Sequence, residues 1–186
     1  DKRYLRELAQ ADIAVMETVF VESEADLSDG VFSRDVIVKP AISAGSNNTA
    51  RYKNDVAGAT EHARRLLNSG IAVLAQPYQS AIDEYGETGL VYLGGQFSHG
   101  FRKAPIFADN DQNHNGLYVV EEITLRIPSA AERAFGDTVV QFVKNKFGAA
   151  PLYARVDMVV NADGVPELME LELTEPSLFL HLDDES

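Results

Sequence analysis

The chain has 186 residues, 45% of them hydrophobic, no cysteine and a formal net charge of −13 at pH 7. This is long enough to bury the core of one compact domain or of two small lobes, and the lack of cysteine excludes disulfides, thiolate chemistry and cysteine-ligated zinc. So acidic a chain repels bare phosphate, which argues against nucleic acid or an anionic membrane as a partner, although a polyphosphate screened by a divalent metal can still bind.

The first half of the chain predicts short strands around two helices. Apolar residues at helical spacing predict helices over residues 2–11 and 55–68, the second with Asp55 as its N-cap and Gly70 just past its end. Strands are predicted at 15–21, 35–39 and 72–76. The last two are apolar and each is stopped by a proline, which is typical of strands buried on both faces.

The second half predicts two hairpins and one long helix. Gly94-Gly95 is a hairpin signal, and a helix over 129–147 begins with a capping box of Ser129 and Glu132. Strands are predicted at 88–93, 96–102, 118–125, 152–160 and 167–174. This mixture of helices and hairpins predicts an α+β fold with largely antiparallel sheets.

The last hairpin has one apolar face and one charged face. With Asp163-Gly164 as a two-residue turn, counting predicts the opposed pairs Met158–Met169, Asp157–Glu170, Val156–Leu171 and Arg155–Glu172. Side chains alternate between the faces of a strand, so the apolar face carries Val156, Met158, Met169, Leu171 and Leu173. The other face carries Arg155, Asp157, Glu170 and Glu172.

Three carboxylates on one face of the hairpin need more positive charge than Arg155 supplies. Magnesium prefers oxygen ligands and commonly takes one or two carboxylates together with substrate phosphates, and two metals can share a bridging Glu170. The alternative is a solvated acidic face in an acidic protein. Spacing alone leaves both interpretations open.

Lys39 ends a buried strand and precedes a loop of small residues over 43–49. A buried ammonium is costly unless it meets an anion, and such a loop brings backbone N–H groups close to phosphate oxygens. The segment lacks the glycine spacing of a P-loop. A surface turn with a lysine reaching to solvent remains the alternative. We place none of the histidines in the site, and expect His99 to be a packed or hydrogen-bonded strand residue.

Three features occur in a familiar order: Val38-Lys39-Pro40 before the small-residue loop, an apolar strand into Gln76-Pro77-Tyr78, and Asp157 followed by Glu170-Leu171-Glu172. In this the chain resembles the ATP-grasp superfamily, in particular its glutathione-synthetase-like and ribosomal-protein glutamate-ligase-like branch. The run from 169 to 177 is similar to a subgroup that includes the O-ureido-serine cyclo-ligase of cycloserine biosynthesis.

The resemblance implies an ATP-grasp fold, in which two α+β lobes with mostly antiparallel sheets clasp ATP. We expect a small lobe over about 13–76 and a large-lobe core over about 77–186. The N-terminal domain that such ligases normally carry has no counterpart in this chain. We therefore expect the chain to be a piece of a longer protein.

The resemblance also implies a set of site residues. ATP-binding positions are Lys2, Lys39, Ser43 and Gly45 at the phosphates, Gln76, Pro77 and Tyr78 at the adenine, and Glu87 at the ribose. The implied magnesium ligands are Asp157, Glu170 and Glu172, and the implied catalytic residues, which neutralise the phosphoryl group, are Arg102 and Arg155. Glutathione synthetases have a substrate-gripping arginine near Gly89, and its absence argues against a glutathione-type substrate.

The implied function is a cytoplasmic ligase that uses ATP and magnesium, or manganese, to join the carboxylate of a small amino-acid-like substrate to an amine, or to close a ring, through an acyl phosphate. We expect a homo-oligomer and neither a nucleic-acid nor a membrane partner. Two alternatives remain open at this stage. One is a non-catalytic acidic module that binds metal or nucleotide, and the other is a metal-dependent phosphohydrolase with water as acceptor.

Overall fold

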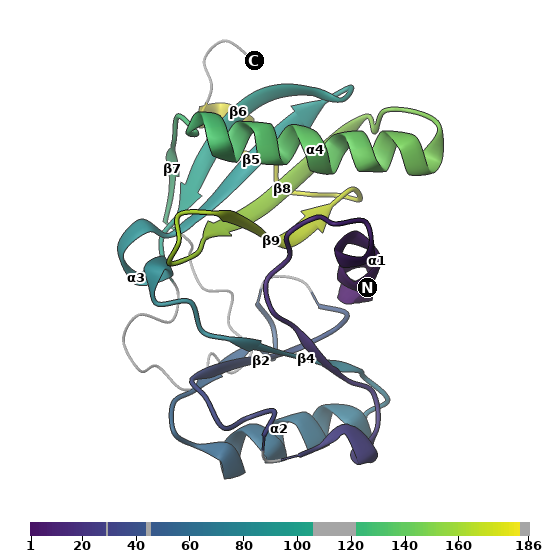
Figure 1. Ribbon diagram of the computed structural model, residues 1–186, viewed down its shortest axis with the longest axis vertical. Helices are drawn as coiled ribbons and strands as arrows, with labels where there is room; N and C mark the ends of the chain where they lie inside the picture. Colours follow the sequence, from purple (N-terminus) through teal and green to yellow (C-terminus); the bar gives the residue numbers. More distant parts are fainter. Residues whose placement is uncertain (29, 44–45, 106–121, 183–186) are drawn as a thin grey trace. The chain divides into compact units, whose positions relative to one another are not determined.

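The computed structural model describes residues 1–28, 30–43, 46–105 and 122–182 (Figure 1). These residues divide into two compact units. The first unit comprises Asp1–Glu7 and Met16–Ser80, and the second comprises Leu8–Val15, Ala81–Pro105 and the described residues from 122 onward. Within the described ranges no helix has the length and apolar character that crossing a membrane requires.

The first unit is a four-stranded antiparallel sheet with one helix on it (Figure 1). The strands are β1 (Val19–Val21), β2 (Val36–Pro40), β3 (Ala50–Tyr52) and β4 (Val73–Pro77), in the order β1-β4-β2-β3. Helix α2 (Val56–Asn68) packs on the sheet through Ala59, Ala63 and Leu66, which lie at helical spacing in the core. Asp55 caps it, as predicted, by accepting a hydrogen bond from the Gly58 N–H.

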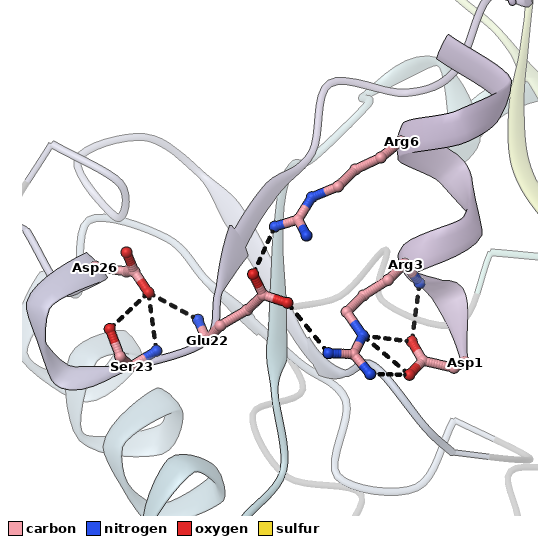
Figure 2. A network of polar contacts seen from close by, with 6 residues as sticks. All are labelled: Asp1, Arg3, Arg6, Glu22, Ser23 and Asp26. Atoms are coloured by element: carbon pink, nitrogen blue, oxygen red, sulfur yellow. Dashed lines mark hydrogen bonds and ion pairs between the residues drawn. The ribbon is translucent and has the colours of Figure 1, made fainter. Parts of the chain in front are cut away.

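A network of charged residues fixes the start of the chain to this sheet (Figure 2). Lys2–Tyr4 form a 3₁₀ helix (η1) that continues into α1 (Leu5–Gln10), and Glu24–Asp26 form a second 3₁₀ turn (η2). Glu22, just past β1, accepts hydrogen bonds from Arg3 at 3.2 Å and Arg6 at 2.9 Å. These contacts are exposed and individually weak, but together they hold the turn that carries Lys2.

His62 lies in the core of this unit, 3% exposed, with its ring 5.8 Å from the ring of Tyr52. Neither ring nitrogen has a hydrogen-bond partner of normal geometry among the described residues. Burial first, and then the charge of Arg65, lower the pKa of His62 from 6.5 to about 4. The neutral ring is therefore the form that the fold accommodates.

This pKa predicts a loss of stability in mild acid. Between pH 6.5 and 4 the unfolded chain takes up a proton at His62 that the folded chain does not, so the contribution is complete above pH 6.5 and falls as the pH drops. We expect His62 to account for a loss of up to about 3 kcal/mol in unfolding free energy over that window. Urea unfolding of the wild type and of His62→Leu at pH 7, 6, 5 and 4 measures it. Parallel pH profiles for the two proteins would contradict it.

The second unit is a five-stranded antiparallel sheet with a long helix across one face (Figure 1). Its strands are β5 (Glu87–Leu93), β6 (Gln96–Lys103), β7 (Ile123–Leu125), β8 (Tyr153–Val160) and β9 (Pro166–Glu172), in the order β7-β6-β5-β8-β9. Its helices are α3 (Ala81–Tyr85), α4 (Ala130–Phe147) and the 3₁₀ turn η3 (Leu180–Leu182). The two antiparallel sheets with their helices confirm the predicted α+β class.

The long helix α4 begins at the predicted capping box of Ser129 and Glu132. The Glu132 side chain is almost fully buried and accepts hydrogen bonds from Thr88 of β5 at 2.8 Å and from Arg126 at 2.9 Å. At Gly136 the helix approaches the sheet so closely that a Cβ would lie 2.5 Å from the Tyr92 hydroxyl. One face of the sheet is therefore closed by α4.

The predicted register of the last hairpin is right at its acidic end and wrong at its turn. Asp157 faces Glu170 and Arg155 faces Glu172, as predicted. The turn, however, spans three residues between Asn161 and Val165, with Gly164 at a φ of +79°, and a β-bulge next to Met158 restores the register. Because of the bulge Met158 pairs with Leu168, so Leu168 takes the core position expected for Met169.

Candidate active site

In the first unit, two lysines that the sequence singled out lie at the same end of β2. Lys39 is the fourth residue of that strand and is 8% exposed. The Lys2 backbone N–H donates to the Ala41 carbonyl at 2.8 Å, directly past the strand. Its Nζ donates to the carbonyl and hydroxyl oxygens of Ser43 at 3.3 and 3.4 Å. The structure thus brings Lys2 and Ser43 together, while Gly45 lies outside the described residues.

The expected adenine-binding segment is the end of β4 and the residue after it. Gln76 is 1% exposed, and its side-chain amide donates to the Thr18 hydroxyl at 2.9 Å. Pro77 lies opposite Val36 in the sheet. The Tyr78 N–H donates to the Asp35 carbonyl at 2.9 Å, so this amide is already engaged within the unit. The segment is rigidly tied to β2.

In the second unit, the charged face of the hairpin contains a buried ion-pair cluster. Asp157 of β8 is 2% exposed and accepts hydrogen bonds from Arg155 at 2.8 Å and from Lys103 Nζ at 3.0 Å. Arg155, 5% exposed, also donates to the carboxylate of Glu172 on β9. Two cations and two carboxylates from three strands are therefore joined on the sheet face opposite α4.

The pKa values of this cluster follow from its charges. Burial alone would raise the pKa of Asp157, but Lys103 and Arg155 outweigh it and hold that pKa below the usual range. Burial raises the pKa of Glu172, and Asp157 and Glu170 raise it further against the opposing charge of Arg155. The cluster therefore keeps Asp157 ionised and leaves Glu172 as the more easily protonated carboxylate.

Lys103 was missed by the sequence analysis, which ended the strand at Arg102. The two residues are neighbours in β6 and so point to opposite faces of the sheet. Arg102 donates to the carbonyl of Tyr85 at 2.7 Å, at the end of α3, and not to the acidic face. The same alternation rule puts Lys103 on the face of Phe101, and the pairing of β6 with β5 and of β5 with β8 brings that face to Asp157. Glu87 lies directly opposite Lys103 in the register.

The three expected metal ligands offer the right chemistry, since carboxylate oxygens are what magnesium prefers. Glu170 lies directly opposite Asp157, and Glu172 is joined to Asp157 through Arg155. Among the described residues, however, no three acidic or histidine side chains converge as a metal ion would need. The donor set fits magnesium, and holding the ion with all three carboxylates would require their side chains to move closer together.

Comparison with solved structures identifies the fold. The D-cycloserine synthetase DcsG superposes with a TM-score of 0.89 and 30% identity, over 100% of this chain and 65% of that one. The D-alanine–D-alanine ligase of Bacillus anthracis in complex with ATP gives a TM-score of 0.66 at 18% identity, over 97% of this chain and 58% of that one. The ATP-grasp ligase PsnB in complex with a minimal precursor, Mg and ADP gives a TM-score of 0.63 at 19% identity. This match covers 98% of this chain and 52% of that one. The chain has the ATP-grasp fold.

Sequence comparison points to one of the same proteins. No family model matches it. The cycloserine biosynthesis protein DcsG of Streptomyces lavendulae is 32% identical over 191 residues, which cover 97% of this chain and 63% of that protein. By sequence and by fold the chain is thus similar to DcsG. It spans less than two thirds of the length of this relative.

Proposed function

We propose that the chain is the nucleotide-binding and catalytic part of an ATP-dependent ligase that forms a carbon–nitrogen bond. The observation that carries the proposal is the cluster of three buried charges, Lys103, Arg155 and Asp157, with the half-buried Glu172, in a chain with the ATP-grasp fold. Buried charges of both signs are costly to maintain and concentrate at functional sites. Solved ATP-grasp relatives hold ATP, or Mg and ADP.

The proposed reaction has two steps. A carboxylate oxygen of the substrate attacks the γ-phosphorus of ATP, so that the bond to the bridging oxygen breaks, ADP leaves and an acyl phosphate forms. A nitrogen nucleophile then attacks the acyl carbon, loses its proton and displaces inorganic phosphate. Both steps depend on alignment and on neutralising the charge of the transferred group rather than on a covalent enzyme intermediate.

The residues of the chain divide this work between them. Lys2 and Lys39 at the end of β2 would hold ATP phosphates, and Arg155 and Lys103 would neutralise the phosphoryl group and the acyl phosphate, a task that suits the planar fork of arginine. Asp157, Glu170 and Glu172 would hold magnesium, which supplies positive charge at the phosphate oxygens when bound. Tyr78 and its neighbours would position the adenine.

The substrate that we infer is a small amino-acid-like carboxylate that also carries the nitrogen nucleophile, with O-ureido-serine as the first candidate. The likeness to a cycloserine biosynthesis protein supports this choice. Gly89 supports it from another direction. A Cβ at this position would lie 2.1 Å from the ring of Phe101, so an arginine here, of the kind that grips glutathione-type substrates, would have to displace that ring.

The experiment measures ADP release by the protein with ATP, magnesium and either enantiomer of O-ureido-serine, together with mass spectrometry of the product. We expect ADP release to require the substrate and to match cyclised product one for one. ADP release without substrate would indicate a phosphohydrolase. Binding of ATP without any ADP release across a panel of amino acids would indicate a non-catalytic nucleotide-binding module.

A further inference from the structure

The chain that follows β9 is fixed residue by residue to the charged face of the second unit. Arg155 of β8 donates from Nη1 to the Ser177 carbonyl at 3.2 Å. His99 of β6 bonds the next carbonyl, that of Leu178, at 2.9 Å from Nε2. The ring of Phe179 packs edge-on against Phe101 of β6, with centroids 4.7 Å apart. Three consecutive residues, which we call the clamped segment (Ser177–Phe179), are thus each held by a different side chain of the sheet.

An irregularity in the pairing of β6 directs the His99 side chain toward this segment. Between the pairs Leu90–Gly100 and Tyr92–Phe97, two residues of β6 stand against one of β5, so Ser98 and His99 form a β-bulge. The Ser98 hydroxyl lies 3.0 Å from His99 Nδ1. Because a carbonyl can only accept, Nε2 must carry the hydrogen, and Nδ1 of the neutral ring then accepts from Ser98. Bulges commonly redirect a side chain next to an active site.

Two residues, one just before the clamped segment and one at its end, have a backbone conformation that residues with a side chain seldom adopt. Glu175 and Phe179 have φ values of +54° and +50°, in the left-handed region. A bulky residue adopts this conformation only where its surroundings impose it, and such positions cluster where function demands them. Arg155 and His99 bond the carbonyls of Ser177 and Leu178, which lie between these two positions.

The same guanidinium that holds Ser177 also holds Asp157 and Glu172. The clamped segment therefore lies one side chain away from the carboxylates at which phosphoryl transfer is proposed. A substrate whose carboxylate is phosphorylated at that cluster would then lie near this backbone. The position of this backbone then decides how well the substrate is aligned.

We propose that His99 is a positioning residue of the reaction: through its hydrogen bond to Leu178 it fixes the clamped segment beside the acidic cluster, where the segment aligns the carboxylate substrate. The alignment of a substrate rests on the proposed function, whereas the hydrogen bond that holds the clamped segment does not. His99 touches neither nucleotide nor metal ligand in this account, so its loss affects the substrate and not ATP.

Two amide variants separate this role from simple packing. The His99→Gln side chain can place an N–H near the position of Nε2, whereas His99→Asn, one methylene shorter, reaches only the position of Nδ1. The first measurement is amide hydrogen exchange of the nucleotide-free protein over residues 179–182, where the Leu182 N–H donates to the Phe179 carbonyl at 2.9 Å. We expect these amides to exchange at least about fivefold faster in His99→Asn than in the wild type. In His99→Gln we expect them to exchange at nearly the wild-type rate. Equal exchange in the wild type and His99→Asn would overturn the clamp.

The second measurement is steady-state turnover of the same proteins with O-ureido-serine and ATP. We expect KM for O-ureido-serine to rise about fivefold or more in His99→Asn, with KM for ATP unchanged, and the rise to be reversed in His99→Gln. A uniform loss of kcat in both variants, or equal changes in both KM values, would overturn the positioning role. If the wild type turned over no carboxylate substrate, the proposed function would fail, while the exchange measurement would still decide the clamp.

Discussion

Replacing Arg155 with methionine is expected to lower turnover by about 10³-fold, because a guanidinium that neutralises a transferring phosphoryl group contributes that much in other phosphoryl-transfer enzymes. It is also expected to lower the free energy of unfolding by about 3 kcal/mol, since Asp157 and Glu172 would lose a buried cationic partner. Arg155→Lys keeps the charge but loses the planar fork, so we expect partial recovery of stability and little recovery of turnover.

The matched control for this variant is Arg133→Met on α4. Arg133 also pairs with a carboxylate, that of Asp137 at 3.0 Å, and lies over the Phe97 ring, but the two paired side chains are 40% and 50% exposed. We expect this change to cost at most about 1 kcal/mol and to leave turnover unaltered. Urea unfolding and ADP release measure both effects. Equal losses of stability in the two methionine variants would show that the cluster at Arg155 is not energetically distinct.

Glu170→Gln, unlike Arg155→Met, is expected to lower turnover without lowering the free energy of unfolding. Turnover should fall by about 10²–10³-fold, because an oxygen ligand of the metal loses its charge. Stability should stay the same or rise, since the charge of Glu170 raises the pKa of Glu172 and so opposes its ionisation in the fold. The measurements are ADP release, magnesium titration and urea unfolding.

The control for this second variant is Glu167→Gln, in the same strand β9. Glu167 accepts a hydrogen bond from Asn161 at 2.8 Å near the turn of the hairpin. Neutralising it should leave magnesium affinity and turnover unchanged. Retained turnover in Glu170→Gln would remove Glu170 from the mechanism, and equal loss in both variants would point to net charge rather than to a ligand.

Local sequence signals predicted the elements that position the site. The caps of α2 and α4 are formed by Asp55 and Ser129, whose short polar side chains satisfy the first backbone N–H groups of each helix. The pairing of Asp157 with Glu170 was also predicted correctly, although the turn assumed for that prediction was too short. The turn is one residue longer than Asp163-Gly164 indicates, and the bulge next to Met158 compensates for the difference.

What the sequence did not predict depends on contacts between distant residues. Strand β3 has only three residues, with Arg51 in the middle, and carries no periodicity of its own. Lys103 stands 54 residues from Asp157, and nothing near it in the chain indicates a carboxylate partner. His99 was expected to be packed or hydrogen-bonded, and it is, but its partner Leu178 lies 79 residues away. Only the folded sheet brings these groups together.

The acidic hairpin is proposed to be a metal–nucleotide site. The most direct test is calorimetric titration of the protein with a non-hydrolysable ATP analogue, with and without magnesium, on the wild type and on Glu170→Ala. We predict that the wild type binds the analogue much more tightly with magnesium, and that Glu170→Ala loses most of that gain. Binding that is equally tight without magnesium, or that is unchanged in Glu170→Ala, would contradict the claim.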